Sequence, residues 1–374
     1  MAPSHERLVS LDAFRGATIA GMILVNNPGT WSAIYPQLEH AGWNGWTFTD
    51  WIFPFFLWIV GVAMTMSLGG RLERGVSRKV ILLQALKRSA IIFAIGLFLA
   101  GFPSLDLSTI RIPGVLQRIA VCYLAASLIM MTTKGSRGRV VWLVALLASY
   151  WVIMKLVPAP GIGTGLLERG NNFSAYVDRL VLTGHMWGQT RTWDPEGIVS
   201  TLPAIGTTLF GVLTGGFLRG NRTKEEKTAW MFVAGNALLL LGAILDMWLP
   251  INKSIWTSSY AVFMAGWALV CFATFYWLID VRRYRRWATP FVIFGMNAIA
   301  VYTLSEFLAK LIDSVIVFRM SDGTLVSLQE RIFRSLFLPL ASPVNASLIF
   351  AVCYVLFMFL FALALWKKGW FIRA

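Results

Sequence analysis

Residues 51–68 read WIFPFFLWIVGVAMTMSL, an apolar stretch of eighteen positions that holds no charged side chain. A helix needs about 20 mostly apolar residues to cross the hydrocarbon core of a bilayer, which is about 30 Å thick. The stretch therefore predicts a transmembrane helix. Comparable stretches recur along the whole chain, so the sequence predicts an all-α polytopic membrane protein.

Ten segments meet this criterion at approximate boundaries. They are 11–27, 51–68, 84–102, 113–132, 140–157, 198–218, 229–249, 257–279, 289–310 and 344–366. The first, third and ninth segments are weaker predictions of a membrane span because each contains charged side chains. The apolar stretch 331–343 is interrupted by proline, which leaves spanning, re-entrant and interfacial placements open.

The overall composition excludes other classes of protein. Of the 374 residues, 57% are hydrophobic and only 14% are charged, and the mean hydropathy is +0.66. Soluble chains carry about 25% charged residues, so a soluble enzyme, a disordered protein and a secreted disulfide scaffold are all excluded. The three cysteines lie inside apolar stretches, and we interpret them as small buried hydrophobes.

The basic residues indicate the orientation in the membrane. If the N-terminus is inside and the ten segments alternate, about 21 Lys and Arg fall on the inner side and about 8 on the outer side. Cytoplasmic loops carry such an excess, so both termini are predicted to be cytoplasmic. The net charge of +15 then indicates contact with anionic lipid headgroups of the bilayer and requires no nucleic acid partner.

Three segments on the predicted outer side, 28–50, 158–197 and 311–343, are long and rich in Trp, Asn, Gly and Pro. Loops of this length are uncommon unless they have a function. We treat residues 1–374 as one domain and interpret the first apolar segment as a retained helix, not a cleaved signal peptide.

The first outer loop carries the strongest candidate for chemistry. Residues 36–50 read PQLEHAGWNGWTFTD, which places His40 beside Glu39, Asn44 and Asp50. An imidazole with a pKa of about 6.5 suits a general base at neutral pH. The alternative is an interfacial histidine beside an aromatic belt.

Charged side chains inside membrane segments are costly and often functional. Arg118, next to Gln117, lies a turn inside the fourth segment and is expected to face an occupied cavity. Asp12 and Arg15 share one helix face, so they form a functional pair or a snorkelling pair at the cytoplasmic end.

Other polar residues of the membrane segments are open to more than one interpretation. Glu306 and Lys310 are four residues apart and are expected to satisfy each other. Asn26 ends the first segment, where it is either a helix terminator or a donor to an oxyanion. Walker, dinucleotide, His-Glu-x-x-His and CxxC motifs are absent from the sequence, so no metal site is expected.

Several strings, in order along nearly the whole chain, together resemble the heparan-α-glucosaminide N-acetyltransferase family. They are LDAFRG (11–16), VN (25–26), HAGWNG (40–45), DWIFP (50–54), RIPGVLQR (111–118), DPEG (194–197), the segment 252–260, and GMN (295–297). The strings at 40–45 and 111–118 are specific enough to make a chance match unexpected.

The resemblance implies a membrane enzyme that moves an acetyl group from cytoplasmic acetyl-CoA to the amino group of a glucosamine-type sugar on the far side. It places the family's active-site histidine on His40 and its catalytic asparagine on Asn26. The chain begins at its first helix without the luminal domain of the animal enzymes, which resembles the bacterial branch. A multi-pass location in the bacterial cytoplasmic membrane and a homodimer are expected on the same basis.

A mechanistic hypothesis assigns roles to nine residues. The catalytic candidates are His40 as base, Asn26 at the oxyanion and Asp50 to orient the imidazole. The acetyl-CoA candidates are Arg15, Gln117 and Arg118, the two arginines helping to dock the nucleotide at the basic cytoplasmic face. The sugar candidates are Trp43, Asn44 and Glu39. Direct transfer and transfer through an acetylated His40 both remain open. The alternative function is an amino-sugar permease, in which Asp246 and Glu306 would relay protons.

Overall fold

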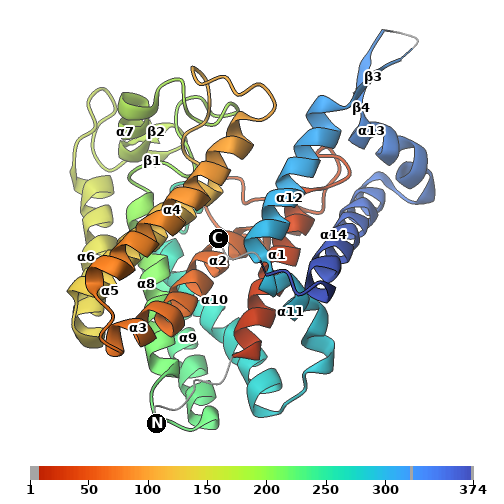
Figure 1. The fold of residues 1–374 in the computed structure, drawn as a ribbon. Helices are drawn as coiled ribbons and strands as arrows, with labels where there is room; N and C mark the ends of the chain where they lie inside the picture. The colour runs from red at the N-terminus through yellow and green to blue at the C-terminus, as the bar shows by residue number, and fades with distance from the viewer. Residues whose placement is uncertain (1–7, 321–322, 372–374) are drawn as a thin grey trace.

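A computed structural model describes residues 8–320 and 323–371 as a helical bundle (Figure 1). The α-helices are α1 (Val9–Asn26), α2 (Thr49–Met64), α3 (Gly70–Glu73), α4 (Arg78–Gly101), α5 (Val115–Thr132), α6 (Gly135–Leu156), α7 (Phe173–Leu182), α8 (Thr201–Leu218), α9 (Lys224–Asp246), α10 (Ser258–Tyr276), α11 (Thr289–Met296), α12 (Ala298–Lys310), α13 (Leu328–Ile332) and α14 (Pro343–Lys367). The terminal positions at 1–7 and 372–374, for which a cytoplasmic side is predicted, lie outside the described residues.

Short π-helical and 3₁₀ segments interrupt or extend these helices. The π-helical segments are η2 (Thr65–Gly69), η3 (Trp277–Val281), η5 (Leu311–Val315) and η6 (Phe333–Phe337), and the 3₁₀ segments are η1 (Pro36–Leu38), η4 (Arg286–Ala288) and η7 (Leu338–Leu340). Two small antiparallel hairpins, β1 (Leu167–Glu168) with β2 (Asn171–Asn172) and β3 (Val317–Arg319) with β4 (Leu325–Ser327), lie in the long loops.

The predicted class, a helical polytopic membrane protein, is confirmed. Within the described residues, eight helical runs are long and apolar enough to cross a membrane, and they coincide with the second to eighth and the tenth predicted segments. A ninth span results if α11 and α12, bent by 72° at Asn297, count as one broken span. The first predicted segment is the helix α1 but is not among these runs, so the number ten stays a prediction.

The stretch 331–343 forms no single span in the structure. It begins in the last turn of α13 and continues through η6 and η7, each of which is five residues or fewer. The proline in η7 and the extended residue Ala341 end the helical run before α14 begins. These breaks leave the stretch too short to cross a bilayer as one helix.

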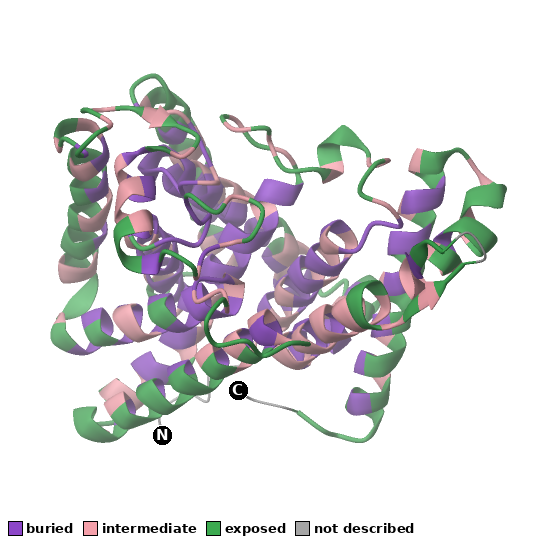
Figure 2. Cartoon of the chain, turned by 90° about the horizontal axis from the view of Figure 1, so that it is seen from above, coloured by how far each residue is buried: buried purple, intermediate pink, exposed green. Residues whose placement is uncertain are grey.

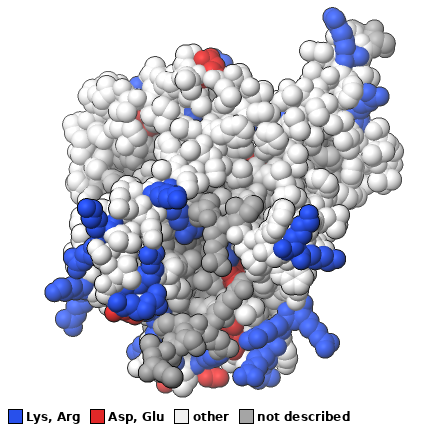
Figure 3. All heavy atoms as spheres, in the orientation of Figure 1, with Lys and Arg blue, Asp and Glu red and all other residues white. Residues whose placement is uncertain are grey.

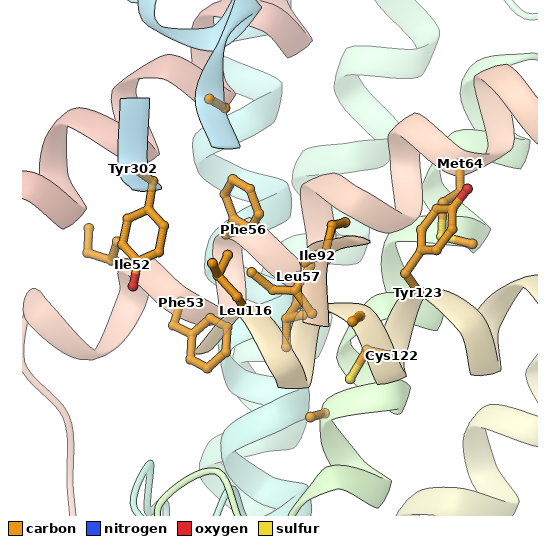
Figure 4. Packing of buried hydrophobic residues seen from close by; sticks show 14 of the residues in the cluster. Ile52, Phe53, Phe56, Leu57, Met64, Ile92, Leu116, Cys122, Tyr123 and Tyr302 are labelled. Atoms are coloured by element: carbon orange, nitrogen blue, oxygen red, sulfur yellow. The ribbon is translucent and has the colours of Figure 1, made fainter. Parts of the chain in front are cut away.

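Burial separates inner from outer helices. In an apolar stretch of 18 residues within the helical run Thr49–Glu73, which contains α2, 78% of the residues are buried inside the protein. The corresponding share in α6 is 17%. Figure 2 shows buried residues gathered in the middle of the bundle and exposed residues on outlying helices. Apolar side chains such as Phe56, Leu57 and Leu116 fill the centre (Figure 4).

The cysteines are free; Cys122 is buried as predicted, but Cys353 is exposed on α14.

Glycines bring two helix pairs into backbone contact. A Cβ added at Gly16 of α1 would lie 1.7 Å from the carbonyl oxygen of Phe291, and one at Gly295 of α11 would lie 1.9 Å from that of Asp12. Gly61 of α2 and Gly211 of α8 stand in the same reciprocal relation, because a Cβ at either would lie within about 2.0 Å of a carbonyl oxygen of the other helix. Small residues at such crossings are the usual means of close packing in membrane bundles.

The two ends of the bundle differ in charge. Lys and Arg gather in the lower half of the view in Figure 3, and the upper half shows few. We call the lower part, formed by the connections 74–77, 133–134, 219–223 and 282–285, the basic end. There Arg219 on the connection after α8 pairs with Glu73 of α3. The opposite part, formed by 28–48, 102–114, 157–200 and 247–257, is called the loop end.

Candidate active site

A buried carboxylate orients His40 at the loop end. Asp50 lies in the first turn of α2, where its Oδ2 accepts hydrogen bonds from the backbone N–H groups of Ala41 (3.0 Å) and Thr47 (2.9 Å). Its Oδ1 lies 2.6 Å from Nδ1 of His40. Because an ionised carboxylate only accepts, Nδ1 carries the proton. The Asp50 side chain is 1% exposed and that of His40 is 52% exposed, so the carboxylate is buried while half of the imidazole surface is open.

Lys253, in the connection between α9 and α10, contacts that other edge. Its Nζ lies 3.3 Å from Nε2 of His40. Burial lowers the pKa of His40 below its usual 6.5 and the Lys253 ammonium lowers it further, whereas the Asp50 carboxylate opposes both effects. Burial likewise lowers the pKa of Lys253. At neutral pH the imidazole is therefore neutral, with an Nε2 lone pair available to take a proton.

Arg111, Asp194 and Glu196 form an ion-paired group whose charge acts on His40. Arg111 donates from Nε and Nη2 to both carboxylate oxygens of Asp194 (2.9 and 2.7 Å) and from Nη2 to Oε2 of Glu196 (2.5 Å). Burial alone would raise the pKa of Glu196, but Arg111 and Lys253 lower it overall. Glu196 is therefore a carboxylate that favours the charged form of both His40 and Lys253.

The predicted sugar-binding residues lie in the same loop as His40. The amide oxygen of Asn44 accepts a hydrogen bond from Nδ2 of Asn252 (3.1 Å). Trp43 donates from Nε1 to the carbonyl oxygen of Leu167 (2.9 Å), and the Arg169 guanidinium lies 5.4 Å from the ring centroid. The position of Arg169 restricts access to the Trp43 ring. Glu39 is exposed at the surface of the loop.

Asn26 belongs to a second polar group, centred on α12. Its Nδ2 donates to Oε1 of Glu306 (3.1 Å), while Nζ of Lys310 donates to the carbonyl oxygen of Leu99 (2.5 Å). The prediction that Glu306 and Lys310 satisfy each other holds only in part: their charges favour each other, but within the described residues no direct ion pair joins them. Their hydrogen bonds go to other helices instead, to Asn26 of α1 for Glu306 and to Leu99 of α4 for Lys310.

Gln117 and Arg118 lie in the first turn of α5 and are buried at 4% and 2% exposure. Arg118 donates from Nη2 to the carbonyl oxygen of Gly197 (3.1 Å) and to Oγ of Ser200 (2.5 Å). Its Nε and Nη1, and Nε2 of Gln117, have no acceptor in the described structure. Since an unsatisfied buried donor costs about 1–3 kcal/mol, these donors are suited to a polar ligand.

A small apolar hollow lies between α1, α2, α5 and α12. It is lined by Ile19, Met22, Phe56, Leu116, Ile119 and Tyr302, among others. The hollow lies in the bundle core, where Figure 4 shows Phe56, Leu116 and Tyr302.

Arg15 lies in the other half of α1, near the basic end. It pairs with Asp12 (Nη2 to Oδ1, 2.8 Å), as both sequence-based interpretations expected. Its Nε also donates to the carbonyl oxygen of Gly295 (2.6 Å), at the end of α11 where the helix breaks. Arg15 thus contacts α11, whereas Arg118 contacts the segment just before α8.

Sequence reasoning did not assign a role to Lys253, Glu196 or Arg111. Each comes from a different segment of the chain, and only the fold brings Lys253 to His40 and Arg111 to Glu196. The signal that could have found them was present, because all three lie in strings that carry the family resemblance.

Fold and site together define a polytopic membrane protein with a histidine-centred polar site at one end. A family model described as heparan-alpha-glucosaminide N-acetyltransferase, catalytic, matches residues 7–249. The human heparan-alpha-glucosaminide N-acetyltransferase is 30% identical over 354 residues, which covers 80% of this chain and 53% of the relative. The mouse protein of the same name is 29% identical over 359 residues, or 82% and 54%. The chain belongs to the heparan-α-glucosaminide N-acetyltransferase family and spans about half the length of these relatives.

Proposed function

We propose that the protein transfers an acetyl group from acetyl-CoA on the cytoplasmic side to the amino group of a glucosamine-type sugar at the loop end. Family membership supports an acetyltransferase. The observation that carries the proposal is His40, whose half-exposed ring is held through Nδ1 by a buried carboxylate. Its Nε2 faces Nζ of Lys253, and this lysine moves aside when the sugar amine binds. This is the arrangement that a general base requires.

In the proposed reaction, Nε2 of His40 takes a proton from the sugar amine as its nitrogen attacks the thioester carbonyl. The new C–N bond forms and the C–S bond breaks, and the imidazolium returns the proton to the leaving thiolate. Asp50 holds the ring in the tautomer that leaves Nε2 unprotonated. Asn26 remains our candidate for the oxyanion donor, but its amide must leave Glu306 to serve that role.

The donor would enter from the basic end, where Lys and Arg gather to meet its phosphates. The pantetheine arm carries amide oxygens, and the unpaired donors of Gln117 and Arg118 fit such acceptors. Arg118 lies at the loop end of α5, so we assign it to the arm and not, as the sequence suggested, to the nucleotide. Arg15 is nearer the basic end and keeps its assignment to the nucleotide side.

The acceptor sugar would lie among the exposed polar groups of the loop end. Asn44, Glu39 and Trp43 remain proposals for its binding. A location in a bacterial cytoplasmic membrane and a homodimer belong to the same proposal, since neither follows from the described contacts.

Thiol release from acetyl-CoA by the purified protein in detergent tests the proposal. We expect release that depends on glucosamine and falls by about 10²–10⁴-fold in His40→Ala. Release without sugar, also lost in His40→Ala, would indicate an acetylated enzyme intermediate. Folded wild-type protein that releases no thiol with any of several amino sugars would contradict acetyl transfer and favour the permease, which labelled-sugar uptake by vesicles would then detect.

A further inference from the structure

Lys253 occupies the position that an acceptor amine needs. Its Nζ lies 3.3 Å from Nε2 of His40, within reach of the lone pair that would take the proton. Lysine and glucosamine are both primary amines. The Lys253 side chain is partly exposed, and the adjacent Asn252 is anchored through its backbone N–H to Oγ1 of Thr257 (3.0 Å). The lysine therefore remains beside the imidazole in this fold.

We propose that Lys253 is a modification site, acetylated by the protein's own active site when acetyl-CoA is present and the sugar acceptor is absent. The inference rests on the proposed function, because the thioester is the acetyl donor. Burial lowers the pKa of Lys253, which increases the fraction of neutral, nucleophilic amine.

The step balances with these groups alone. The neutral Nζ of Lys253 attacks the thioester carbonyl, a C–N bond forms and the C–S bond breaks. Nε2 of His40 takes the proton that Nζ loses and passes it to the departing CoA thiolate. The products are acetyl-lysine and free CoA.

Acetylation would change the electrostatics of the site. It replaces an ammonium beside Nε2 with a neutral amide, and Glu196 and Asp50 lose a nearby cation. The bulkier amide also occupies the space that the sugar amine needs. The modified protein should therefore turn over more slowly, so that the site is slowed when the acceptor is scarce.

Mass spectrometry tests the proposal on full-length protein incubated with acetyl-CoA, with and without glucosamine. Hydroxylamine treatment before digestion removes any labile acetyl-imidazole and leaves the Lys253 amide. We expect acetyl-Lys253 to accumulate without sugar, to fall when glucosamine is added and to be at least tenfold lower in His40→Ala and His40→Asn. The second variant keeps a polar side chain facing Asp50, and size-exclusion profiles check the folding of both.

Lys155 of α6 provides the internal control. It is also partly exposed and near the loop end, but its Nζ lies 3.4 Å from the carbonyl oxygen of Gly165 and not beside an imidazole. Equal acetylation of Lys155 and Lys253, or undiminished Lys253 acetylation in the His40 variants, would show uncatalysed acetylation and overturn the inference. Parallel thiol assays separate the two proposals, because sugar-dependent release without acetyl-Lys253 contradicts only the modification.

Discussion

At the scale of single residues, His40 has partners of opposite effect on its two nitrogens. Asp50 contacts Nδ1 and favours the protonated ring, whereas Lys253 contacts Nε2 and favours the neutral ring. The Nδ1 edge of the imidazole is therefore held by the carboxylate, and the Nε2 edge faces the lysine amine. Replacing either neighbour should therefore shift the pKa of His40, and with it the pH dependence of the rate, in opposite directions.

We expect the acid limb of kcat/KM to lie below pH 6.5, because burial and Lys253 lower the pKa of His40 and the rate falls as the base becomes protonated. Lys253→Gln removes a lowering influence, so its limb should move to higher pH. Asp50→Asn removes a raising influence, so its limb should move to lower pH, with a plateau reduced by about 10²-fold through loss of orientation. Thiol-release rates between pH 4.5 and 8 measure both variants. Shifts in the same direction would contradict the assigned contacts.

The sequence predicted part of this site for a physical reason. His40 and Asp50 are only ten residues apart, in a loop and the first turn of the helix that follows it, so a local pattern can bring them together. Glu306 and Lys310 show the limit of local patterns: their charges favour each other as the spacing predicted, but the hydrogen bond to Glu306 comes from Asn26 on another helix. Lys253 is 213 residues from His40 along the chain, and no local pattern encodes that contact.

At the scale of helices, the apolar runs were predictable because each satisfies its own backbone hydrogen bonds in the bilayer. The break at Asn297 was not predictable from the sequence, because it depends on side chains and carbonyl groups of other helices. Arg15 of α1 donates to the carbonyl oxygen of Gly295, and Nδ2 of Asn297 donates to that of Trp370 (3.0 Å). The Arg15 bond satisfies a carbonyl of the interrupted helix, and the Asn297 bond ties the break to the segment that follows α14.

The glycine crossings give a prediction about stability. Ala in place of Gly within a helix gains about 1 kcal/mol of intrinsic propensity, but at Gly16 or Gly61 the new Cβ would overlap a backbone carbonyl. Overpacking typically costs about 1–3 kcal/mol or more, so both variants should unfold at lower temperature in detergent. Gly188→Ala is the control, because no atom lies within 4 Å of its added Cβ. Unchanged melting of Gly16→Ala and Gly61→Ala would refute the packing argument.

At the scale of the whole molecule, the proposed reaction requires the basic end and the loop end to face different compartments. Ser136, just after the α5–α6 connection, and Ser104, after α4, are both exposed and lie at opposite ends of the bundle. In a variant whose Cys122, Cys271 and Cys353 are replaced, a membrane-impermeant maleimide should label Ser104→Cys in intact cells. Ser136→Cys should react only after permeabilisation. The reverse pattern would place the basic end outside and contradict the proposed direction of transfer.

The reciprocal glycines also bear on how this chain can diverge over evolutionary time. A substitution at Gly16 or Gly295 reduces how many molecules reach the folded state, whereas one at His40 reduces what each folded molecule accomplishes. A lineage that abandoned the chemistry would be free to change the histidine while still retaining the glycines. Family members that keep the crossings but have lost His40 would therefore be expected to persist as folded membrane proteins with a different task.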